Sequence, residues 1–189
     1  MKKIVIFASG SGTNAENIIK YFAETKIATV VAVFTNRLDA KVIERAKNHQ
    51  VPVVVFSKND FIESKIAQKL NSFRPDLIVL AGFLLKFPQN IVEAYLDKII
   101  NIHPALLPKY GGKGMYGMNI HRTVVENKEK ETGITIHFVN ENYDEGNIFF
   151  QKNIFLSGNE TPEEVADKIH DLEQKYFPTV IEEILNLKS

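Results

Sequence analysis

The feature that most constrains the fold is a series of short apolar segments that have no polar face. They lie before residue 103, at residues 3–8, 29–35, 51–56, 76–82 and 98–102. Strands with one solvated face alternate apolar and polar residues, whereas these segments do not, which favours parallel strands covered on both faces. Between them, apolar residues have helical spacing at residues 14–25, 40–48 and 60–73. The pattern predicts an α/β fold with a doubly wound, mostly parallel sheet and right-handed crossovers.

The pattern changes after residue 102. Residues 109–119 are rich in glycine and predict a loop, and residues 120–128 predict a helix. Residues 132–140 and 148–156 each have the character of a strand, and the turn at residues 141–147 joins them. We therefore expect an antiparallel hairpin added to the parallel sheet.

The last predicted element is a long terminal helix. Thr161, Pro162 and Glu164 have the spacing of an N-cap, a proline at the first helical position and the glutamate of a capping box. Pro178 lies inside the apolar pattern of this helix and is expected to interrupt or restart it. The 189 residues contain no internal repeat and no long linker, so we expect one domain.

Charge and composition exclude several classes of function. Lys and Arg together number 23, as do Asp and Glu, so no overall field favours nucleic acid or a membrane as the partner. Cysteine is absent, which excludes disulfides, thiolate metal sites and a cysteine nucleophile. The basic and apolar start of the chain resembles a short signal peptide, but it leads into a glycine loop and is better explained as a buried strand. No apolar stretch approaches the ~20 residues that span a bilayer, so a cytoplasmic protein is expected.

A glycine-rich loop follows the first predicted strand and leads into the first predicted helix. Its glycines permit a sharp turn, and the free N–H groups of the helix start attract an anion. Gly10, Gly12 and Ala15 also fit a dinucleotide fingerprint, but no acidic residue ends the second strand to hold a ribose. Arg37 stands near that position and can accept a 2′-phosphate. Phosphate binding, dinucleotide binding and a tight turn without a ligand all remain open on this pattern.

The strand at residues 98–102 ends on polar side chains, although its other residues are apolar. Asn101 and His103 are two residues apart, so both side chains point to the same side of an extended chain. An amide can donate to a developing oxyanion, and a histidine can transfer a proton near neutral pH. Asp144, in the turn of the predicted hairpin, would raise the pKa of the imidazole if the fold brings it close. The alternative is a polar pair that merely ends a strand.

The three residue types favour carbonyl chemistry without a covalent enzyme intermediate, because no serine or cysteine nucleophile accompanies them. The chemistry that fits is direct transfer of an acyl-like group between two bound substrates, or its hydrolysis. A metal site formed by His103, His121, His137 and Asp144 is a further alternative. The histidines lack the spacing of a helical metal motif, and we expect no metal.

Five motifs, in order along almost the whole chain, resemble one known family. They are ASGSGTN (8–14), AGFLLKF (81–87), NIHPALLPKYGG (101–112), TGITIHFVNENYDEGNIFFQ (132–151) and LEQKYFP (172–178). They resemble the glycinamide ribonucleotide formyltransferases, which transfer a formyl group from 10-formyltetrahydrofolate to glycinamide ribonucleotide in purine biosynthesis without a metal. The resemblance implies a single domain with a Rossmann-like formyltransferase fold. It places phosphate binding in residues 1–100, and catalysis and folate binding in residues 101–189.

The resemblance also implies roles for individual residues. Asn101 and His103 would stabilise the tetrahedral oxyanion, and Asp144 would pair with His103 and assist removal of the amine proton. The substrate phosphate and ribose would be held by Gly12, Thr13, Asn14 and Glu173, which favours phosphate binding over dinucleotide binding. Folate would be bound by Phe83, Leu84, Lys86, Phe87, Ile99, Val139, Glu141, Asn142 and Tyr143. Thr135, His137 and His121 would support the catalytic residues.

The chain departs from the family pattern at several positions. Leu85 stands where many members have an arginine that meets the glutamate tail of folate, and Lys86 can substitute for it. The loop from Gly111 to Asn119 is longer than the common form, and Asn119 replaces a frequent histidine. The family's basic contact to substrate is not evident, and Lys58 is a candidate. Lys113, in the long loop, is another residue that can reach substrate.

Two other enzymes of the superfamily and one binding protein remain as alternatives. A formyltetrahydrofolate deformylase shares the same Asn, His and Asp but usually has an N-terminal regulatory domain, whereas this sequence starts at the first strand. A sugar-nucleotide N-formyltransferase normally has more chain after the catalytic domain. A nucleotide-binding module without catalysis would not need Asn101, His103 and Asp144. The partners expected are therefore two small molecules, and the protein is expected to be a monomer or a homodimer.

Overall fold

The structure is a computed structural model of the 189-residue chain, and it describes residues 1–62 and 65–187. These residues form two compact units. The first unit comprises residues 1–100 and 178–189, and the second comprises residues 101–177. Two elements contribute to both units. They are the strand β5 (Ile99–His103) and the final helix α7 (Pro162–Leu187).

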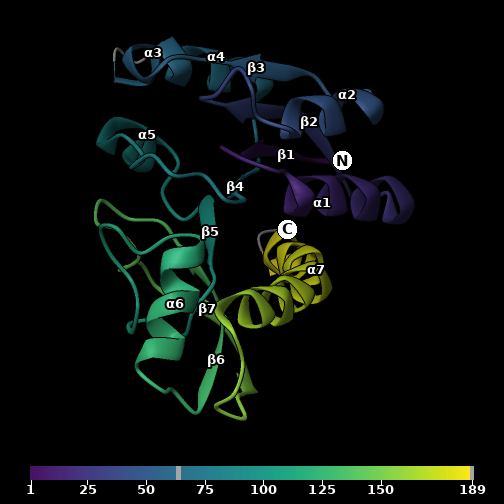
Figure 1. The fold of residues 1–189 in the computed structure, drawn as a ribbon. Coiled ribbons are helices and arrows are strands. Elements are labelled where there is room, and N and C mark those ends of the chain that lie inside the picture. Colours follow the sequence, from purple (N-terminus) through teal and green to yellow (C-terminus); the bar gives the residue numbers. More distant parts are fainter. Residues whose placement is uncertain (63–64, 188–189) are drawn as a thin grey trace. The chain divides into compact units, whose positions relative to one another are not determined.

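The first unit alternates strands and helices, and the helices flank the strands (Figure 1). Its strands are β1 (Lys2–Phe7), β2 (Ala28–Thr35), β3 (Val53–Val55) and β4 (Leu77–Leu80), followed by the start of β5. Its helices are α1 (Thr13–Thr25), α2 (Val42–Asn48), α3 (Lys58–Ile62), α4 (Lys65–Phe73) and α5 (Gln89–Ala94). The helix expected over residues 60–73 corresponds to α3 and α4, and residues 63–64 lie outside the described part. Helix α5 was not predicted, because its six residues are too few to establish a period.

The strand pairings of the first unit confirm the predicted parallel sheet. β1 pairs in parallel with both β2 and β4, and β2 pairs in parallel with β3. The complete strand order is β3-β2-β1-β4-β5-β6-β7, so the chain reverses its direction of sheet growth between β1 and β4. This is the switch point of a doubly wound fold, where the loops at the carboxyl ends of neighbouring strands separate.

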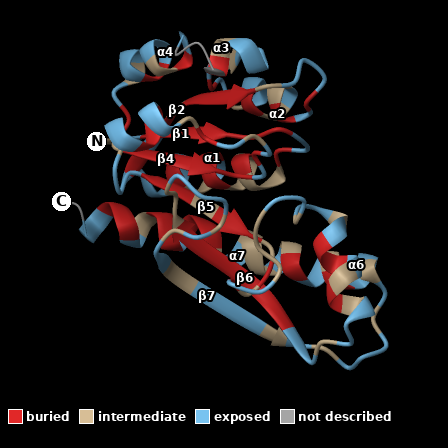
Figure 2. Cartoon of the chain, turned by 90° about the vertical axis from the view of Figure 1, so that its left-hand side faces the viewer, coloured by how far each residue is buried: buried red, intermediate tan, exposed pale blue. Residues whose placement is uncertain are grey.

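β1, β2 and β4 are buried on both faces, as their sequence predicts, whereas β3, at the edge of the sheet, is half-buried or exposed, so the same expectation is wrong for it. Figure 2 shows β1, β2 and β4 as largely buried. Phenylalanine rings form a contact network in this unit, and Phe7 lies at its centre, with the stacked ring of Phe34 at 4.8 Å between centroids. The other rings that contact Phe7 are Phe56, Phe61, Phe83 and Phe87. Large aromatic areas removed from water contribute strongly to the stability of such a core.

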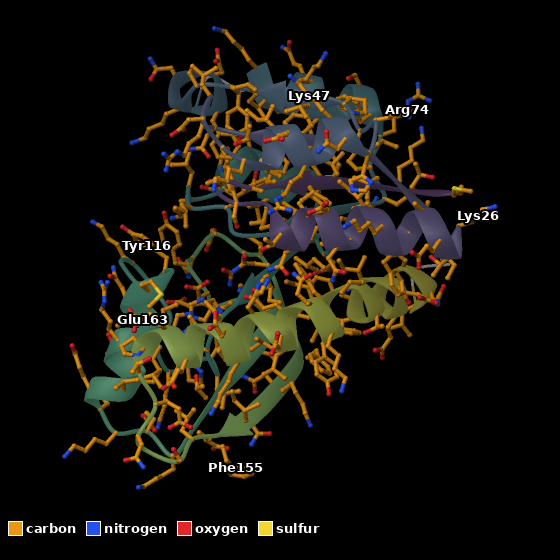
Figure 3. All side chains as sticks on the ribbon, turned by 45° about the vertical axis from the view of Figure 1, so that its right-hand side comes forward. Lys26, Lys47, Arg74, Tyr116, Phe155 and Glu163 are labelled. Carbon is orange, nitrogen blue, oxygen red and sulfur yellow. The ribbon has the colours of Figure 1, made fainter. Side chains whose placement is uncertain are left out.

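The second unit contains the predicted helix and hairpin. Helix α6 spans Met118–Glu126, and strands β6 (Glu131–Phe138) and β7 (Ile148–Phe155) pair antiparallel. β6 is almost entirely buried, whereas β7, the last strand of the sheet, is largely exposed (Figure 2). Phe155, at the end of β7, is 79% exposed (Figure 3).

Helix α7 begins as predicted but is not interrupted where an interruption was predicted. The Thr161 N–H donates to the Glu164 side chain at 2.8 Å, and the Glu164 N–H donates to Thr161 Oγ1 at 3.2 Å, which completes the capping box. The expected interruption at Pro178 is wrong, because α7 runs through it to Leu187. A proline removes one backbone donor, but here the apolar stripe of Phe177, Val180 and Ile181 remains buried around it and favours the helical conformation. In the described part of the chain, no helix is long and apolar enough to cross a membrane.

Candidate active site

Four polar side chains come together in the second unit from segments that are far apart in the sequence. Asn101 and His103 are on β5, His137 is on β6, and Asp144 is in the turn between β6 and β7. His103 and His137 are buried, and the side chain of Asp144 is 11% exposed. Neighbouring strands and one hairpin turn therefore bring together the residues that the sequence analysis singled out separately.

Asp144 is at the centre of this group. Its Oδ1 atom lies 3.6 Å from His103 Nδ1, 3.6 Å from His137 Nε2 and 3.5 Å from Asn101 Nδ2. Its Oδ2 atom accepts a hydrogen bond of 2.9 Å from the backbone N–H of Gly112. One carboxylate thus contacts both imidazoles and the amide, while a loop N–H fixes its orientation.

The hairpin turn that carries Asp144 has an unusual backbone conformation. Asp144 itself has φ 56°, in the left-handed region that aspartate tolerates better than most residues. A Cβ at Gly146 would lie 1.7 Å from the carbonyl oxygen of Phe138, so only glycine fits there. This close approach closes the turn and keeps the carboxylate beside β5.

Backbone carbonyls define the tautomers of both histidines, because a carbonyl can only accept a hydrogen bond. His103 Nε2 lies 2.8 Å from the Tyr110 carbonyl oxygen, so Nε2 carries the proton and Nδ1 of the neutral ring faces Asp144. His137 Nδ1 lies 2.9 Å from the Phe138 carbonyl oxygen, so Nε2 of the neutral ring is an acceptor. Asn101 Nδ2 donates to that atom at 3.2 Å, which orients the amide with its N–H groups inward.

The pKa of His103 moves in the direction opposite to the one expected from its carboxylate neighbour. Burial lowers the pKa below 6.5 and outweighs the charge of Asp144 and the Tyr110 carbonyl, which both raise it. Burial alone would raise the pKa of Asp144, but a hydrogen bond from His137 and the charge of His103, which act when these rings are protonated, and the Gly112 N–H hold it below its usual value. A neutral imidazole and an ionised carboxylate therefore face each other at neutral pH.

Thr135 holds the segment that follows His103. This fully buried hydroxyl donates to the Ala105 carbonyl oxygen at 2.7 Å and accepts from the Leu107 N–H at 3.0 Å. It also accepts from Gln151 Nε2 at 2.9 Å, which links β7 to the same segment. Two of these three hydrogen bonds join Thr135 to the backbone of residues 105 and 107, so it acts on the site through the backbone.

Glu173 acts through its charge on His103 and on His121, and it also pairs with His170. His121 on α6 is 5% exposed, burial lowers its pKa, and its Nδ1 has no hydrogen-bond partner within residues 1–62 and 65–187. The charge of Glu173 on α7 raises the pKa of both His121 and His103, although burial is the larger influence on each. His170 Nδ1 lies 3.7 Å from Glu173 Oε2, and this pairing raises the pKa of His170.

The glycine loop lies in the first unit, between β1 and α1. Gly12 is the N-cap of α1, with φ 75°, and has no side chain to cap the first turn, which Thr13 and Asn14 begin. Helix α2 packs tightly against the loop, because the Val42 N–H donates to the Gly10 carbonyl oxygen at 3.2 Å. A Cβ at Gly12 would lie 2.5 Å from Val42 Cβ, so a side chain would displace α2 from the loop.

Ser9 connects the ends of three strands at the switch point of the first unit. Its N–H donates to the Gly82 carbonyl oxygen after β4 at 3.0 Å, and its hydroxyl accepts from the Leu84 N–H at 3.1 Å. The hydroxyl also donates to Asn36 Oδ1 after β2 at 2.7 Å. The loops at the carboxyl ends of β1, β2 and β4 therefore form one hydrogen-bonded edge.

The residues expected to bind folate differ in exposure. Phe83, Phe87 and Ile99 are buried at 9%, 4% and 1%, whereas Leu84 and Lys86 are exposed. Both phenylalanines belong to the ring network around Phe7. Their burial is what an ordinary core would also require.

The remaining expected folate residues, in the second unit, are more accessible. Val139 is half-buried, and Glu141, Asn142 and Tyr143 are exposed in the turn that carries Asp144. The Asn142 N–H donates to Asn140 Oδ1 at 2.9 Å, which stabilises this turn.

Basic residues considered for substrate contacts are at the surface. Arg37 forms a bidentate pair with Asp39, with Nε–Oδ1 at 3.1 Å and Nη2–Oδ2 at 2.8 Å. Lys58, at the start of α3, and Lys113, in the glycine-rich loop, are exposed. Within residues 1–62 and 65–187, no three His, Cys, Asp or Glu side chains form a group that could hold a metal ion.

Several contacts of the site were not found from the sequence, and three of them show why. Two of them use backbone atoms, the Tyr110 carbonyl and the Gly112 N–H, and a backbone atom leaves no signal in residue type. The third is the pairing of His170 with Glu173, which the spacing of three residues on a helix would have indicated.

Known proteins resemble the chain over nearly its whole length. A family model described as "Formyl transferase" matches residues 2–181. A phosphoribosylglycinamide formyltransferase from Bacillus subtilis is 36% identical over 100% of this chain and 97% of the relative. A chloroplastic one from Arabidopsis thaliana is 37% identical over 95% of this chain, which spans 64% of that relative's length. The crystal structure of a phosphoribosylglycinamide formyltransferase from Bacillus halodurans superimposes with a TM-score of 0.89 at 32% identity, over 100% of this chain and 97% of that one.

Proposed function

The chain belongs to the formyl transferase family, and we propose that it transfers the formyl group of 10-formyltetrahydrofolate to the amine of glycinamide ribonucleotide in de novo purine biosynthesis. The observation that carries the proposal is the group of Asn101, His103 and Asp144, arranged around one ionised carboxylate. The relatives that the chain resembles over most of its length have names that state this activity.

Asn101 stabilises the charge that develops on the formyl oxygen. One Nδ2–H donates to His137, whereas the contact of Nδ2 with Asp144 Oδ1 at 3.5 Å is at the limit of a hydrogen bond. The second N–H is therefore available to an oxyanion formed when the amine attacks the formyl carbon. A donor that is already oriented strengthens its hydrogen bond in the transition state without reorganisation.

His103 and Asp144 handle the protons. Nδ1 of the neutral His103 ring can accept a proton on the side of Asp144, and the carboxylate stabilises the imidazolium that results. Asp144 is ionised and accepts the proton of the attacking amine, directly or through a water. Collapse of the tetrahedral intermediate breaks the bond from the formyl carbon to folate nitrogen N10. N10 then takes up the proton that the amine gave to Asp144. No covalent enzyme intermediate forms.

We propose that the glycine loop and α7 bind glycinamide ribonucleotide. Gly12 allows the backbone to approach a phosphate closely, and the start of α1, with Thr13 and Asn14, favours an anion as a helix N-terminus does. Glu173 binds the ribose. The pterin is bound by the residues of the motif AGFLLKF and by the hairpin turn, namely Phe83, Leu84, Lys86, Phe87, Ile99, Val139, Glu141, Asn142 and Tyr143. Leu85, in place of the family's arginine, weakens the contact to the glutamate tail of folate. Lys86 makes that contact instead.

We propose further that the protein acts as a single formyltransferase domain in the cytoplasm, as a monomer or a homodimer. Residues 1–100 bind phosphate, and residues 101–189 carry catalysis and folate binding. Both substrates are small molecules, and the equal numbers of basic and acidic residues support the absence of a nucleic-acid or membrane partner.

The test is a steady-state assay that follows loss of 10-formyltetrahydrofolate with and without glycinamide ribonucleotide. We expect turnover only in the presence of the amine. Turnover that does not depend on the amine would overturn the proposal in favour of a formyltetrahydrofolate deformylase. Turnover only with an amino sugar nucleotide would assign the sugar-nucleotide N-formyltransferase activity.

A further inference from the structure

Tyr110 lies in the loop after β5, and its backbone contacts His103. Its carbonyl oxygen accepts the Nε2–H of His103 at 2.8 Å. Tyr110 has φ 58°, in the left-handed region that tyrosine rarely adopts, so surrounding contacts must hold this conformation. The orientation of the carbonyl, and with it the imidazole, depends on those contacts.

The side chain of Tyr110 is held at both its ring and its hydroxyl. The hydroxyl donates to Glu129 Oε1 at 2.7 Å and accepts from Asn127 Nδ2 at 3.0 Å. Burial raises the pKa of Tyr110, so the hydroxyl keeps its proton at neutral pH. The ring and Met115 are partly buried and pack against a cluster of core residues formed by Ala105, Ile120 and Val124.

Glu129 is an ionised acceptor for this hydroxyl. The hydrogen bond from Tyr110 and the ion pair with Lys109, at 3.1 Å, lower its pKa. A hydrogen bond to a charged acceptor is stronger than one between neutral groups. The connection between α6 and β6, where Glu129 and Asn127 lie, is therefore joined to the residue whose carbonyl accepts the hydrogen bond from His103.

The imidazole of His103 has few other partners to define its orientation. Asp144 faces Nδ1 at 3.6 Å, which is too long for a strong hydrogen bond, and His137 and Glu173 act on the ring through their charges. The contact to the Tyr110 carbonyl is the short one. If the contact to the Tyr110 carbonyl weakens, the proton can move from Nε2 to Nδ1. Nδ1 then faces Asp144 as a donor and can no longer accept a proton on that side.

We propose that Tyr110, clamped by Glu129 and Asn127, is a positioning residue that keeps the neutral ring of His103 protonated on Nε2, with Nδ1 toward Asp144. The proposal rests on the catalytic role proposed above for His103. It assigns a purpose to Glu129, 26 residues beyond His103 in the sequence and without contact to the reacting groups.

The main test is Tyr110→Phe, which removes only the hydroxyl. We expect kcat to fall roughly tenfold while both KM values stay within about twofold, because the substrates still bind but the base is misoriented. The carbonyl contact raises the pKa of His103, so its weakening lowers that pKa. The acidic limb of the pH profile of kcat should therefore move to lower pH in the variant. Nitrogen NMR of the substrate-free protein should show His103 protonated at Nε2 in the wild type and a mixture of tautomers in the variant.

Two further variants separate positioning from general loss of stability. Glu129→Gln keeps an acceptor for the hydroxyl and should retain most of the activity, whereas Glu129→Ala should behave like Tyr110→Phe. Lys109→Ala removes the other contact of Glu129 and should leave kcat and the tautomer unchanged. Melting curves check that each variant is folded.

The proposal is overturned if Tyr110→Phe keeps the wild-type kcat and tautomer, or if the wild-type ring is protonated at Nδ1. The NMR measurement needs no substrate. If the wild type fails to formylate glycinamide ribonucleotide, the proposed function fails, and the tautomer of Tyr110→Phe still decides whether this residue orients His103.

Discussion

Asp144 combines two properties that rarely occur together, a mostly buried position and a retained charge. Burial opposes ionisation, yet the Gly112 N–H, and a hydrogen bond from His137 and the charge of His103 when these rings are protonated, more than offset it. The carboxylate therefore remains a proton acceptor at neutral pH and below. Its contacts to two imidazoles and an amide make it the residue whose charge the site depends on most.

We predict that Asp144→Asn lowers kcat by about 10²- to 10⁴-fold, the range expected for loss of a general base. The fold should survive, because the asparagine carbonyl still accepts the Gly112 N–H. The measurements are kcat in the steady-state assay and a melting curve for each protein. Asp171→Asn, at an exposed position of α7, is the matched control. Near-wild-type turnover of Asp144→Asn would remove the residue from the mechanism.

The central residues of the site were predictable from the sequence, and their chemistry was only partly so. The spacing of Asn101 and His103 in a strand predicted that both face one side, because side chains alternate along a strand. Burial lowers the pKa of His103 overall, although Asp144 raises it as expected, since the sequence shows a carboxylate that can approach but not the depth of burial. The tautomer depends on the Tyr110 carbonyl, and no residue type signals that contact.

At the scale of elements, the contact between α2 and the glycine loop shapes the proposed phosphate site. Arg45 on α2 donates its Nε–H to the Ser11 carbonyl oxygen at 3.0 Å and forms an ion pair with Glu16 on α1. The same helix contributes Val42, which packs against Gly12. Arg45 thus connects the glycine loop to α1 and α2. A guanidinium has only donors, so Arg45 does not hydrogen-bond to the N–H groups of the loop.

We predict that Arg45→Ala raises KM for glycinamide ribonucleotide roughly tenfold, because the loop loses its fixed carbonyl and must be ordered on binding. The KM for 10-formyltetrahydrofolate and kcat should change little. Lys47→Ala, at an exposed position of the same helix, is the control (Figure 3). An equal change in both KM values would contradict a specific role for Arg45 in the phosphate loop.

The elements themselves followed from sequence patterns wherever the pattern was long. The apolar runs and the capping box located β1, β2, β6 and the start of α7. β3 is shorter than predicted, with three residues, since Pro52 has no N–H to give to a neighbouring strand. Pro178 led to a predicted interruption that does not occur. The effect of proline on a helix can be predicted from the sequence, whereas the burial of the residues around it cannot.

At the scale of the molecule, α7 divides between two compact units, residues 162–177 with the second and 178–187 with the first. Amphipathic spacing predicts that a helix is buried, but not against which part of the chain, so this division had no sequence signal. Both buried histidines with lowered pKa, His103 and His121, belong to the second unit. Its stability should consequently depend on pH.

We predict that the free energy of unfolding falls as pH decreases below about 6.5. The folded pKa values of His103 and His121 lie below the unfolded value of 6.5, so the unfolded chain binds more protons between the two values. Their contribution is complete above pH 6.5 and is lost as pH falls through the folded pKa values, with a slope of up to about 1.4 kcal/mol per pH unit for each. His170 opposes this, because its raised pKa favours folding at low pH, but solvent weakens its contribution.

His121→Leu isolates one of the two contributions. It removes a titrating group and also the Nδ1 atom that has no hydrogen-bond partner among the described residues, so little is lost at neutral pH. Urea unfolding followed at pH 5.0, 6.0, 7.0 and 8.0 should give a smaller loss of stability toward low pH in the variant than in the wild type. The difference should arise below about pH 6.5, because Asp144 and Glu16, whose pKa values are lowered below 3.8 and 4.5, act only in more acidic solution. A variant with the same pH slope as the wild type would mean that burial does not lower the pKa of His121 in the folded protein.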